Sequence, residues 1–328
     1  MKKFKKIIFS DKDGTLLINR FLNNILTYAS AHDCLFVMCS GRTIADTNEI
    51  FKKESVGIPR YTIGDNGAIV YDNKEKKALQ KFLLEKDIIG KVLLKYFELG
   101  GTPQNLRYTN GENIFSFDNP NNHNYYKNSD TVKYIDRISD IEDITKITIS
   151  GNKQLMEQMA EYVSNLGCTS DIGKTGFPIK DSKQYRLDIQ SKQATKGNAV
   201  KFLSEYLGIQ NYSCYGNGWN DFSMFKQALS TGNNISVMDN SPQDLLIAIH
   251  NYIKELKDKG LKKLGQVHLI HGDDAKEAIT KDIHGVASTS TSTSTSNFKN
   301  KYKLQQYPTK PFSASSNPNR ETNHSQIK

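Results

Sequence analysis

Short apolar runs alternate with helical patterns along the first eighty residues of the chain. Residues 6–10 and 34–39 are apolar segments of strand length, and residues 21–29 between them carry apolar side chains at helical spacing. A further strand pair is expected at 60–71, around the strong turn signal Asp-Asn-Gly at 65–67. Continuous apolar strands separated by helices are typical of a parallel sheet covered by helices on both faces.

The pattern changes between about residues 82 and 186. This stretch is richer in Asn, Tyr and Lys and mixes strand and helix signals, such as a strand at 147–150 and a helix at 153–166. The alternation then resumes with a strand at 185–189, a helix at 196–207, a strand at 212–215, a helix at 221–229, a strand at 235–238 and a helix at 242–257. Residues 261–284 fit either a last helix or a last strand.

These patterns predict an α/β fold with a doubly wound parallel-sheet core. The core comprises residues 1–82 and 187–284, and an α+β unit is inserted at 83–186. Residues 285–328 are a Ser/Thr run followed by a Lys-, Asn- and Pro-containing segment. Such a composition cannot bury enough apolar surface to offset its ordering entropy, so we expect a disordered tail.

The positive charge is concentrated in this tail. Residues 285–328 contain six Lys or Arg and one Glu, so they carry +5 of the formal net charge of +9 and leave +4 for residues 1–284. A charge of +4 suits an anionic substrate, but it predicts no nucleic-acid partner without a basic patch or motif. The tail itself fits either a solvated extension or a site for acidic lipid, nucleic acid or protein.

The remaining bulk features predict a cytoplasmic protein. Cys34, Cys39, Cys168 and Cys214 form no Cys-x-x-Cys pair, which favours buried, reduced thiols. The apolar run near the N-terminus is too short for a signal peptide, and no run approaches the roughly 18 apolar residues of a membrane span. We expect no membrane association, and the sequence leaves the oligomeric state open.

Residues able to carry chemistry follow four of the predicted strands. The first segment holds Asp11 and Asp13, two carboxylates that can converge on one phosphorus atom as they leave a strand end. One must be ionised to attack, and the other must be protonated to donate a proton to the leaving oxygen. Gly14 allows a tight turn. The segment lacks the further acids of an EF-hand, so a plain surface turn is the alternative.

Each of the other three segments has an ordinary structural alternative. The segment Ser40-Gly41-Arg42 offers a hydroxyl and backbone amides to phosphate oxygens, or an N-cap to a helix. Lys196, near a helix start, is either a phosphate ligand or a solvated cation. The Gly-rich loop 216–221 ends in Asp221, which can hold a hard cation or cap the next helix.

In this order and at these strand ends, the four segments resemble the four motifs of the haloacid dehalogenase-like (HAD) phosphatase superfamily. The resemblance covers nearly all of residues 1–258 and is most specific at 11–16 and 216–221. The inserted unit lies where class IIB (Cof-type) members place a mobile α/β cap. Residues 65–68 look like the Asn-Gly-Ala turn of that subclass, and 237–241 look like its Met-Gly-Asn-Ala stretch, with Asp239 where Gly is usual.

The resemblance implies Mg²⁺-dependent hydrolysis of a small phosphate monoester through an aspartyl-phosphate. Sugar phosphates are the usual substrates of similar proteins, and a nucleotide or cofactor phosphate is the second choice. Asp11 corresponds to the nucleophile and Asp13 to the general acid and base. Ser40 and Lys196 correspond to the residues that hold the phosphoryl oxygens. The implied metal ligands are Asp11, Asp13, Asn217 and Asp221, and the candidate substrate-binding residues are Gly41, Arg42, Asn66 and Asn220.

One position departs from the family pattern. Family members usually carry Asp, a direct metal ligand, where this chain has Asn217. This difference implies weaker metal affinity or a direct role for Asp221. A catalytically weakened phosphate-binding protein and a phosphomannomutase-type phosphomutase are the alternatives. Five polar residues of the inserted unit are able to contact a sugar phosphate, although a solvated or packing role is favoured for each of them: Arg107, Tyr108, Asn110, Lys174 and Arg186.

Overall fold

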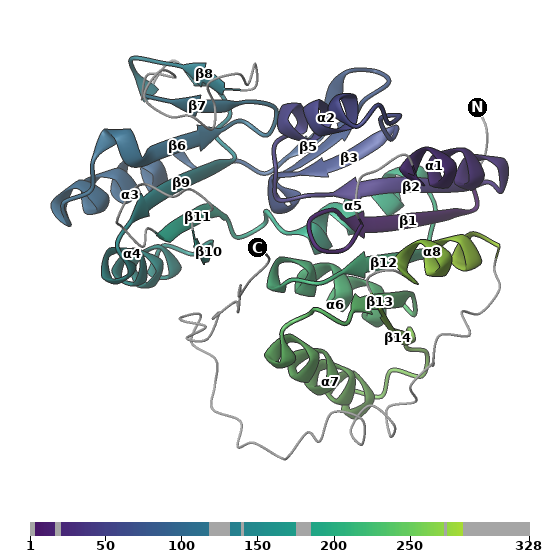
Figure 1. The fold of residues 1–328 in the computed structure, drawn as a ribbon. Helices are drawn as coiled ribbons and strands as arrows, with labels where there is room; N and C mark the ends of the chain where they lie inside the picture. Colours follow the sequence, from purple (N-terminus) through teal and green to yellow (C-terminus); the bar gives the residue numbers. More distant parts are fainter. Residues whose placement is uncertain are drawn as a thin grey trace, which may run out of the picture.

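The computed structural model describes residues 4–16, 21–117, 132–138, 141–174, 185–271 and 274–284. These residues form two sheets that lie side by side (Figure 1). The tail expected at 285–328 falls outside the described residues. Within the described ranges, no helix is both long enough and apolar enough to cross a membrane.

The larger sheet has eight strands, which include the first and the last strand of the described chain. Its strands are β1 (Lys6–Asp11), β2 (Cys34–Cys39), β3 (Tyr61–Gly64), β4 (Ile69–Asp72), β5 (Lys77–Lys81), β12 (Tyr212–Gly216), β13 (Asn234–Met238) and β14 (Val267–Ile270). Their order is β14-β13-β12-β1-β2-β3-β4-β5. All neighbouring strands from β14 to β3 are parallel to each other, whereas β4 is antiparallel to both of its neighbours, β3 and β5. The region 261–284 supplies both a strand, β14, and a helix.

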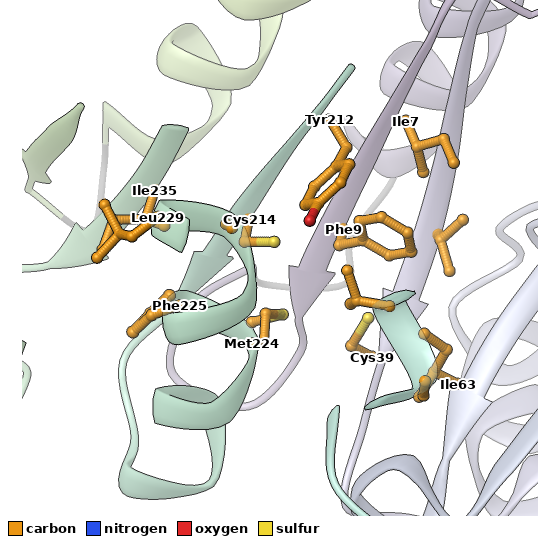
Figure 2. Packing of buried hydrophobic residues seen from close by; sticks show 14 of the residues in the cluster. Ile7, Phe9, Cys39, Ile63, Tyr212, Cys214, Met224, Phe225, Leu229 and Ile235 are labelled. Atoms are coloured by element: carbon orange, nitrogen blue, oxygen red, sulfur yellow. The ribbon is translucent and has the colours of Figure 1, made fainter. Parts of the chain in front are cut away.

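Helices cover both faces of this sheet. They are α1 (Phe21–Ala31), α2 (Ile44–Lys53), α5 (Lys196–Leu207), α6 (Phe222–Ser230), α7 (Gln243–Asp258) and α8 (Ala275–Ile283). Successive strand residues point to opposite faces. Phe9 therefore packs with residues of α5, α6 and α7, whereas Ile8 packs with residues of α1 and α8. Figure 2 shows the first cluster, with Phe9 and Cys214 on neighbouring strands and Met224 and Phe225 on α6. The predicted doubly wound core is confirmed.

The smaller sheet, with two helices, forms a second unit that we call the cap. Its strands are β6 (Leu106–Thr109), β7 (Ile114–Ser116), β8 (Val132–Tyr134), β9 (Lys146–Gly151), β10 (Cys168–Lys174) and β11 (Tyr185–Ser191), and its helices are α3 (Lys86–Glu98) and α4 (Lys153–Asn165). Residues 82–85 and 192–195 connect it to the core. Ile147, Ile149 and Leu187 pack with α3 and α4, while Lys146 and Asp188 lie on the opposite, polar face.

One strand belongs to a different sheet from the one expected. The sequence pattern assigns residues 185–189 to the resumed core alternation, but β11 pairs antiparallel with β9 and β10 of the cap. Its alternation of buried Leu187 and Ile189 with polar Asp188 and Gln190 is that of a strand covered on one face only. The expected boundary at residue 187 therefore falls inside a cap strand.

Candidate active site

The predicted chemical segments meet at the carboxyl edge of the parallel strands. Asp11 is the last residue of β1, Ser40 directly follows β2 and Asn217 directly follows β12. These three strands are neighbours in the sheet, in the order β12-β1-β2. Because parallel strands all end at one edge, the loops after them lie together at this edge, which is the usual ligand site of such sheets.

Lys196 lies between two carboxylates beside this edge of the sheet. Its Nζ is 2.6 Å from Asp11 Oδ1 and 2.6 Å from Asp221 Oδ1, and its side chain is fully buried. It is the first residue of α5, whose N-cap Thr195 accepts a hydrogen bond from the Asn198 amide. The interpretation of Lys196 as a solvated cation is therefore wrong.

The Asp221 carboxylate also fixes the Gly-rich loop. Its Oδ2 accepts hydrogen bonds from the amides of Asn217 and Gly218, each at 2.9 Å. Because its Oδ1 accepts a hydrogen bond from Lys196, both oxygens are engaged with protein donors. This geometry suits a residue that orients the loop and the lysine better than one that binds a metal directly.

Burial and charge perturb this trio strongly. Burial first, and then the charge of Asp221, raise the pKa of Asp11 to about 6, although Lys196 acts to lower it. Burial acts to lower the pKa of Lys196, but the charges of Asp11 and Asp221 outweigh this effect and raise it. With all three groups ionised, the trio carries a net charge of −1. Perturbed, charge-coupled groups of this kind gather at catalytic sites.

The predicted general acid, Asp13, is held by cations in this structure. Its carboxylate forms ion pairs with Lys12 and with Arg42, whose Nε lies 3.1 Å away. Burial acts to raise the pKa of Asp13, but the hydrogen bond from Lys12 and the charge of Arg42 lower it overall. Arg42 also contacts Asp46 at 3.0 Å. Asp13 is therefore a carboxylate at neutral pH in this arrangement.

The segment after β2 lies beside two of the predicted substrate-binding residues. Ser40 is buried, and its Oγ accepts a hydrogen bond from the Arg42 amide at 3.1 Å. Thr43, not Ser40, is the N-cap of α2, so the capping interpretation of Ser40 is wrong. A side chain at Gly41 would lie 2.8 Å from Asn66 Oδ1, and the same oxygen accepts a hydrogen bond from Asn220 at 3.1 Å. Gly41, Asn66 and Asn220 thus lie together.

Oxygen atoms suited to a hard cation converge around one hydroxyl. Thr15 Oγ1 lies 3.5 Å from Asp11 Oδ2 and 3.3 Å from Asn217 Oδ1. Gly14 permits this approach, because it has φ of +84° and a side chain there would lie 2.2 Å from Asn217 Nδ2. Among the described residues, no three His, Cys, Asp or Glu side chains form a metal cluster. A carboxylate, an amide oxygen and a nearby backbone carbonyl nevertheless match the ligand chemistry of Mg²⁺.

The cap residues proposed for substrate recognition differ in position. Tyr108 is buried in the apolar cluster beneath α3 and α4, so its side chain cannot contact a substrate. Asn110 accepts hydrogen bonds from the Glu112 and Asn113 amides and shapes a turn. Arg107 and Arg186 lie on the polar face of the cap sheet, where Arg107 donates to the backbone carbonyls of residues 104 and 106. The side chain of Lys174 falls outside the described residues.

Several residues beside the site have contacts that the sequence did not predict. Asn240 donates to the Gly14 carbonyl at 3.1 Å, and Gln190 contacts Asn66 at 3.4 Å. Asp65 forms an ion pair with Lys146 of β9. The turn motif at 65–67 and the Met-Asp-Asn stretch at 238–240 pointed to two of these regions, but their partners are distant in sequence.

Comparison with known proteins shows the family of this chain. A family model described as haloacid dehalogenase-like hydrolase matches residues 8–264. The chain belongs to the haloacid dehalogenase-like hydrolase family. This match covers most of the chain and confirms the resemblance drawn from the four motifs.

Relatives and solved HAD-like structures extend the comparison. A provisionally named phosphatase of Buchnera aphidicola subsp. Baizongia pistaciae is 27% identical over 248 residues, which cover 72% of this chain and 86% of the relative. A HAD-like hydrolase from Bacteroides thetaiotaomicron has a TM-score of 0.61 at 16% identity and covers 85% of this chain and 100% of that chain. The HAD subclass IIB sugar phosphatase BT4131 has a TM-score of 0.55 at 17% identity, covering 86% and 100%. These structural matches show that the chain shares its fold with HAD-like structures that include a subclass IIB member.

Proposed function

We propose that this HAD-like phosphatase hydrolyses a small phosphate monoester, with Asp11 as the nucleophile. The observation that carries the proposal is the buried trio in which Lys196 Nζ lies 2.6 Å from both Asp11 and Asp221. The ammonium orients Asp11 at the strand end and reduces its repulsion of an incoming phosphate. The same cation can stabilise the negative charge on the equatorial oxygens in the transition state.

The proposed reaction has two displacement steps. A carboxylate oxygen of Asp11 bonds to phosphorus while the bond to the leaving alcohol oxygen breaks, and that oxygen takes a proton from Asp13. Water then attacks the phosphorus of the aspartyl-phosphate and Asp13 takes a proton from this water. The bond from phosphorus to the Asp11 oxygen breaks, which releases inorganic phosphate and regenerates the Asp11 carboxylate. Ser40 and Lys196 hold the phosphoryl oxygens throughout. To act as an acid, Asp13 must leave its ion pairs with Lys12 and Arg42 and take up a proton from solvent.

Mg²⁺ is the proposed cofactor of this site. Asp11, the Asp13 carbonyl and Asn217 are its proposed protein ligands, and the bound ion would supply positive charge beside the phosphoryl oxygens. Asp221 is proposed to orient the loop, because both of its oxygens already accept hydrogen bonds. An asparagine ligand brings an oxygen but no charge, so we expect weaker metal affinity than a second carboxylate would provide.

A sugar phosphate is the proposed substrate class, and a small phosphorylated metabolite is therefore the expected partner. Two observations support this class. The polar face of the cap sheet carries Thr148 and Asp188, which form a 2.6 Å hydrogen bond, and hydroxyl-rich leaving groups need such donors and acceptors. The structurally similar BT4131 is named a sugar phosphatase.

A phosphate-binding protein with weakened catalysis is the second candidate. The ion pairs that hold Asp13 as a carboxylate favour it, as does the uncharged Asn217. Hydrolysis of p-nitrophenyl phosphate with Mg²⁺ distinguishes the two, when wild type is compared with Asp11→Asn and Asn217→Asp. We expect wild type to exceed Asp11→Asn by at least about 100-fold. Equal rates in wild type and Asp11→Asn, with activity recovered in Asn217→Asp, would establish a phosphate-binding protein with weakened catalysis instead.

A further inference from the structure

A buried ion pair joins the cap to the segment after β2. Asp65 is fully buried, and its Oδ1 lies 2.9 Å from the ammonium of Lys146. Lys146 also donates a hydrogen bond to the Gly41 carbonyl oxygen at 3.1 Å. The hydroxyls of Thr109 and Thr145 donate to Asp65 Oδ2 at 2.5 and 2.9 Å. One carboxylate of the core therefore gathers three cap donors, and one of these donors reaches the proposed phosphate-binding loop, Ser40–Arg42.

The charges of this pair depend on each other. Burial acts to lower the pKa of Lys146, but the charge of Asp65 and then that of Asp188 outweigh it and raise this pKa. Lys146 therefore stays protonated at neutral pH. Its hydrogen bond to Gly41 is charge-assisted and hence stronger than a neutral one. Removing Asp65 alone would leave this cation buried without its nearest partner.

The turn that carries Asp65 is also bonded to the phosphate-binding loop through the backbone. The Asp65 amide donates to the Arg42 carbonyl at 2.8 Å, and the Asn66 amide donates to the Ser40 carbonyl at 3.0 Å. With the Lys146 contact to Gly41, all three carbonyls of the Ser40–Arg42 loop accept a hydrogen bond. Two come from this turn and one from the cap, so the loop conformation depends on both.

The other side of the turn contacts the helix start that carries Lys196. A side chain at Gly67 would lie 2.2 Å from the Thr195 carbonyl, so the turn and the start of α5 are in direct contact. Asp65 and Asn66 have φ of +47° and +54°, followed by Gly67 at +101°. Two successive non-glycine residues in the left-handed region are costly and persist only when surrounding contacts hold them. The Asp65 carboxylate supplies such contacts.

We propose that Asp65 and Lys146 are positioning residues, which hold the Ser40–Arg42 loop in the conformation that receives phosphate. They act through the Gly41 carbonyl and the turn, and the inference rests on the proposed function because it takes this loop as the phosphate site. The contacts among Asp11, Lys196 and Asp221 do not involve the pair. Loss of the pair therefore weakens phosphate binding and leaves that trio in place.

The decisive measurement is the affinity for inorganic phosphate by calorimetry, with Mg²⁺ present and well below the melting temperature. In Lys146→Met, the donor to Gly41 is lost and we expect phosphate to bind about tenfold more weakly. Lys81→Met is the matched control. Lys81 also joins the core to the cap, through Glu112 at 3.3 Å and Asp143 at 3.4 Å, but it forms no ion pair with the loop. Its variant should keep wild-type affinity within twofold.

Two neutral double variants keep the test valid if a lone buried charge prevents folding. Asp65→Asn with Lys146→Gln retains a donor for Gly41, and we expect its affinity to stay within threefold of wild type. Asp65→Asn with Lys146→Met lacks this donor and should bind about tenfold more weakly. Wild-type affinity in the folded Met variants would overturn the inference, because a merely structural pair would change the melting temperature alone.

The outcomes for the wild-type chain separate this inference from the proposed function. Phosphate binding without hydrolysis of p-nitrophenyl phosphate would refute the proposed function, while the comparison of variants would still test the positioning role. Failure of the wild-type chain to bind phosphate would refute both.

Discussion

Replacing Lys196 by Met tests the charge balance on which the site depends. The substitution keeps most of the side-chain volume and removes the ammonium that lies 2.6 Å from Asp11 and from Asp221. Both carboxylates are buried, so water cannot replace the lost cation. We expect the variant to be less stable at neutral pH and inactive towards p-nitrophenyl phosphate.

The magnitude follows from the geometry of the trio. Two oxygens that contact one nitrogen at 2.6 Å are at most about 5 Å apart, and at an effective dielectric constant of about 20 their repulsion is about 3 kcal/mol. Removing one partner of a buried ion pair typically costs about 3–5 kcal/mol. We therefore expect the free energy of unfolding to fall by about 3 kcal/mol at pH 7.5, because protonation of Asp11 offers only partial relief.

The pH dependence of this loss has a definite sign. The pKa of Asp11 is already raised from 3.8 to about 6 in the folded protein, and removing the cation raises it further. Above the unfolded value, the folded variant binds more protons than the unfolded chain, so its stability falls as pH rises. The destabilisation should therefore be larger at pH 7.5 than at pH 5.

Urea unfolding at both pH values, followed by circular dichroism, measures the effect. Lys201→Met is the control, because Lys201 is an exposed residue of the same helix, and its substitution should change stability by less than about 0.5 kcal/mol. An equal loss at pH 5 and pH 7.5, or a loss below about 1 kcal/mol at both, would refute the charge-balance reasoning.

Two further predictions concern packing and acid stability. Gly197→Ala would bring Cβ within 2.4 Å of the Ser223 carbonyl oxygen, so urea unfolding should show a loss of about 1–3 kcal/mol. Gly90 lies in an open position of α3, so Gly90→Ala should raise the free energy of unfolding by about 0.5–1 kcal/mol. An equal change in stability at both glycines would contradict the steric explanation. Burial lowers the pKa of His268 from 6.5, despite the opposing charge of Asp282. The unfolded chain therefore binds more protons at His268 than the folded protein does, and the free energy of unfolding falls as pH falls below 6.5. His268→Leu should reduce this loss, by at most about 1.4 kcal/mol per pH unit. A variant whose urea unfolding changes between pH 7.5 and 5 as much as that of wild type would contradict this prediction.

The core of the fold could be predicted because burial leaves a local signal. Strands β1, β2 and β12 are covered on both faces, so their apolar runs are nearly continuous and easy to recognise. The meeting of Asp11 and Ser40 was predictable as well, because neighbouring parallel strands end at one edge. Strand β11 was recognisable as a strand, but the alternation of apolar and polar residues along a strand does not indicate which strands it pairs with. Its assignment to the core was therefore wrong.

Contacts between distant charged side chains could not be predicted in the same way. Lys12 and Asp13 are adjacent in sequence, yet no spacing rule indicates that Arg42 completes an ion-pair set with them. Asp65 was visible as part of a turn, but its ion pair with Lys146 exists only because the cap sheet lies against that turn. Each long side chain has several charges within reach, and the fold selects among them.

Local chemistry, periodicity and strand-end position were enough to identify most helices and strands of the core, the nucleophile candidate Asp11 and the family resemblance. These properties depend on neighbouring residues and on the general geometry of parallel sheets. The folding of the core decided which carboxylates share Lys196 and which is held by Arg42, and the packing of the cap against the core decided which is held by Lys146. Such pairings depend on desolvation and distance in the folded state, and both quantities are undefined until segments far apart in sequence are brought together.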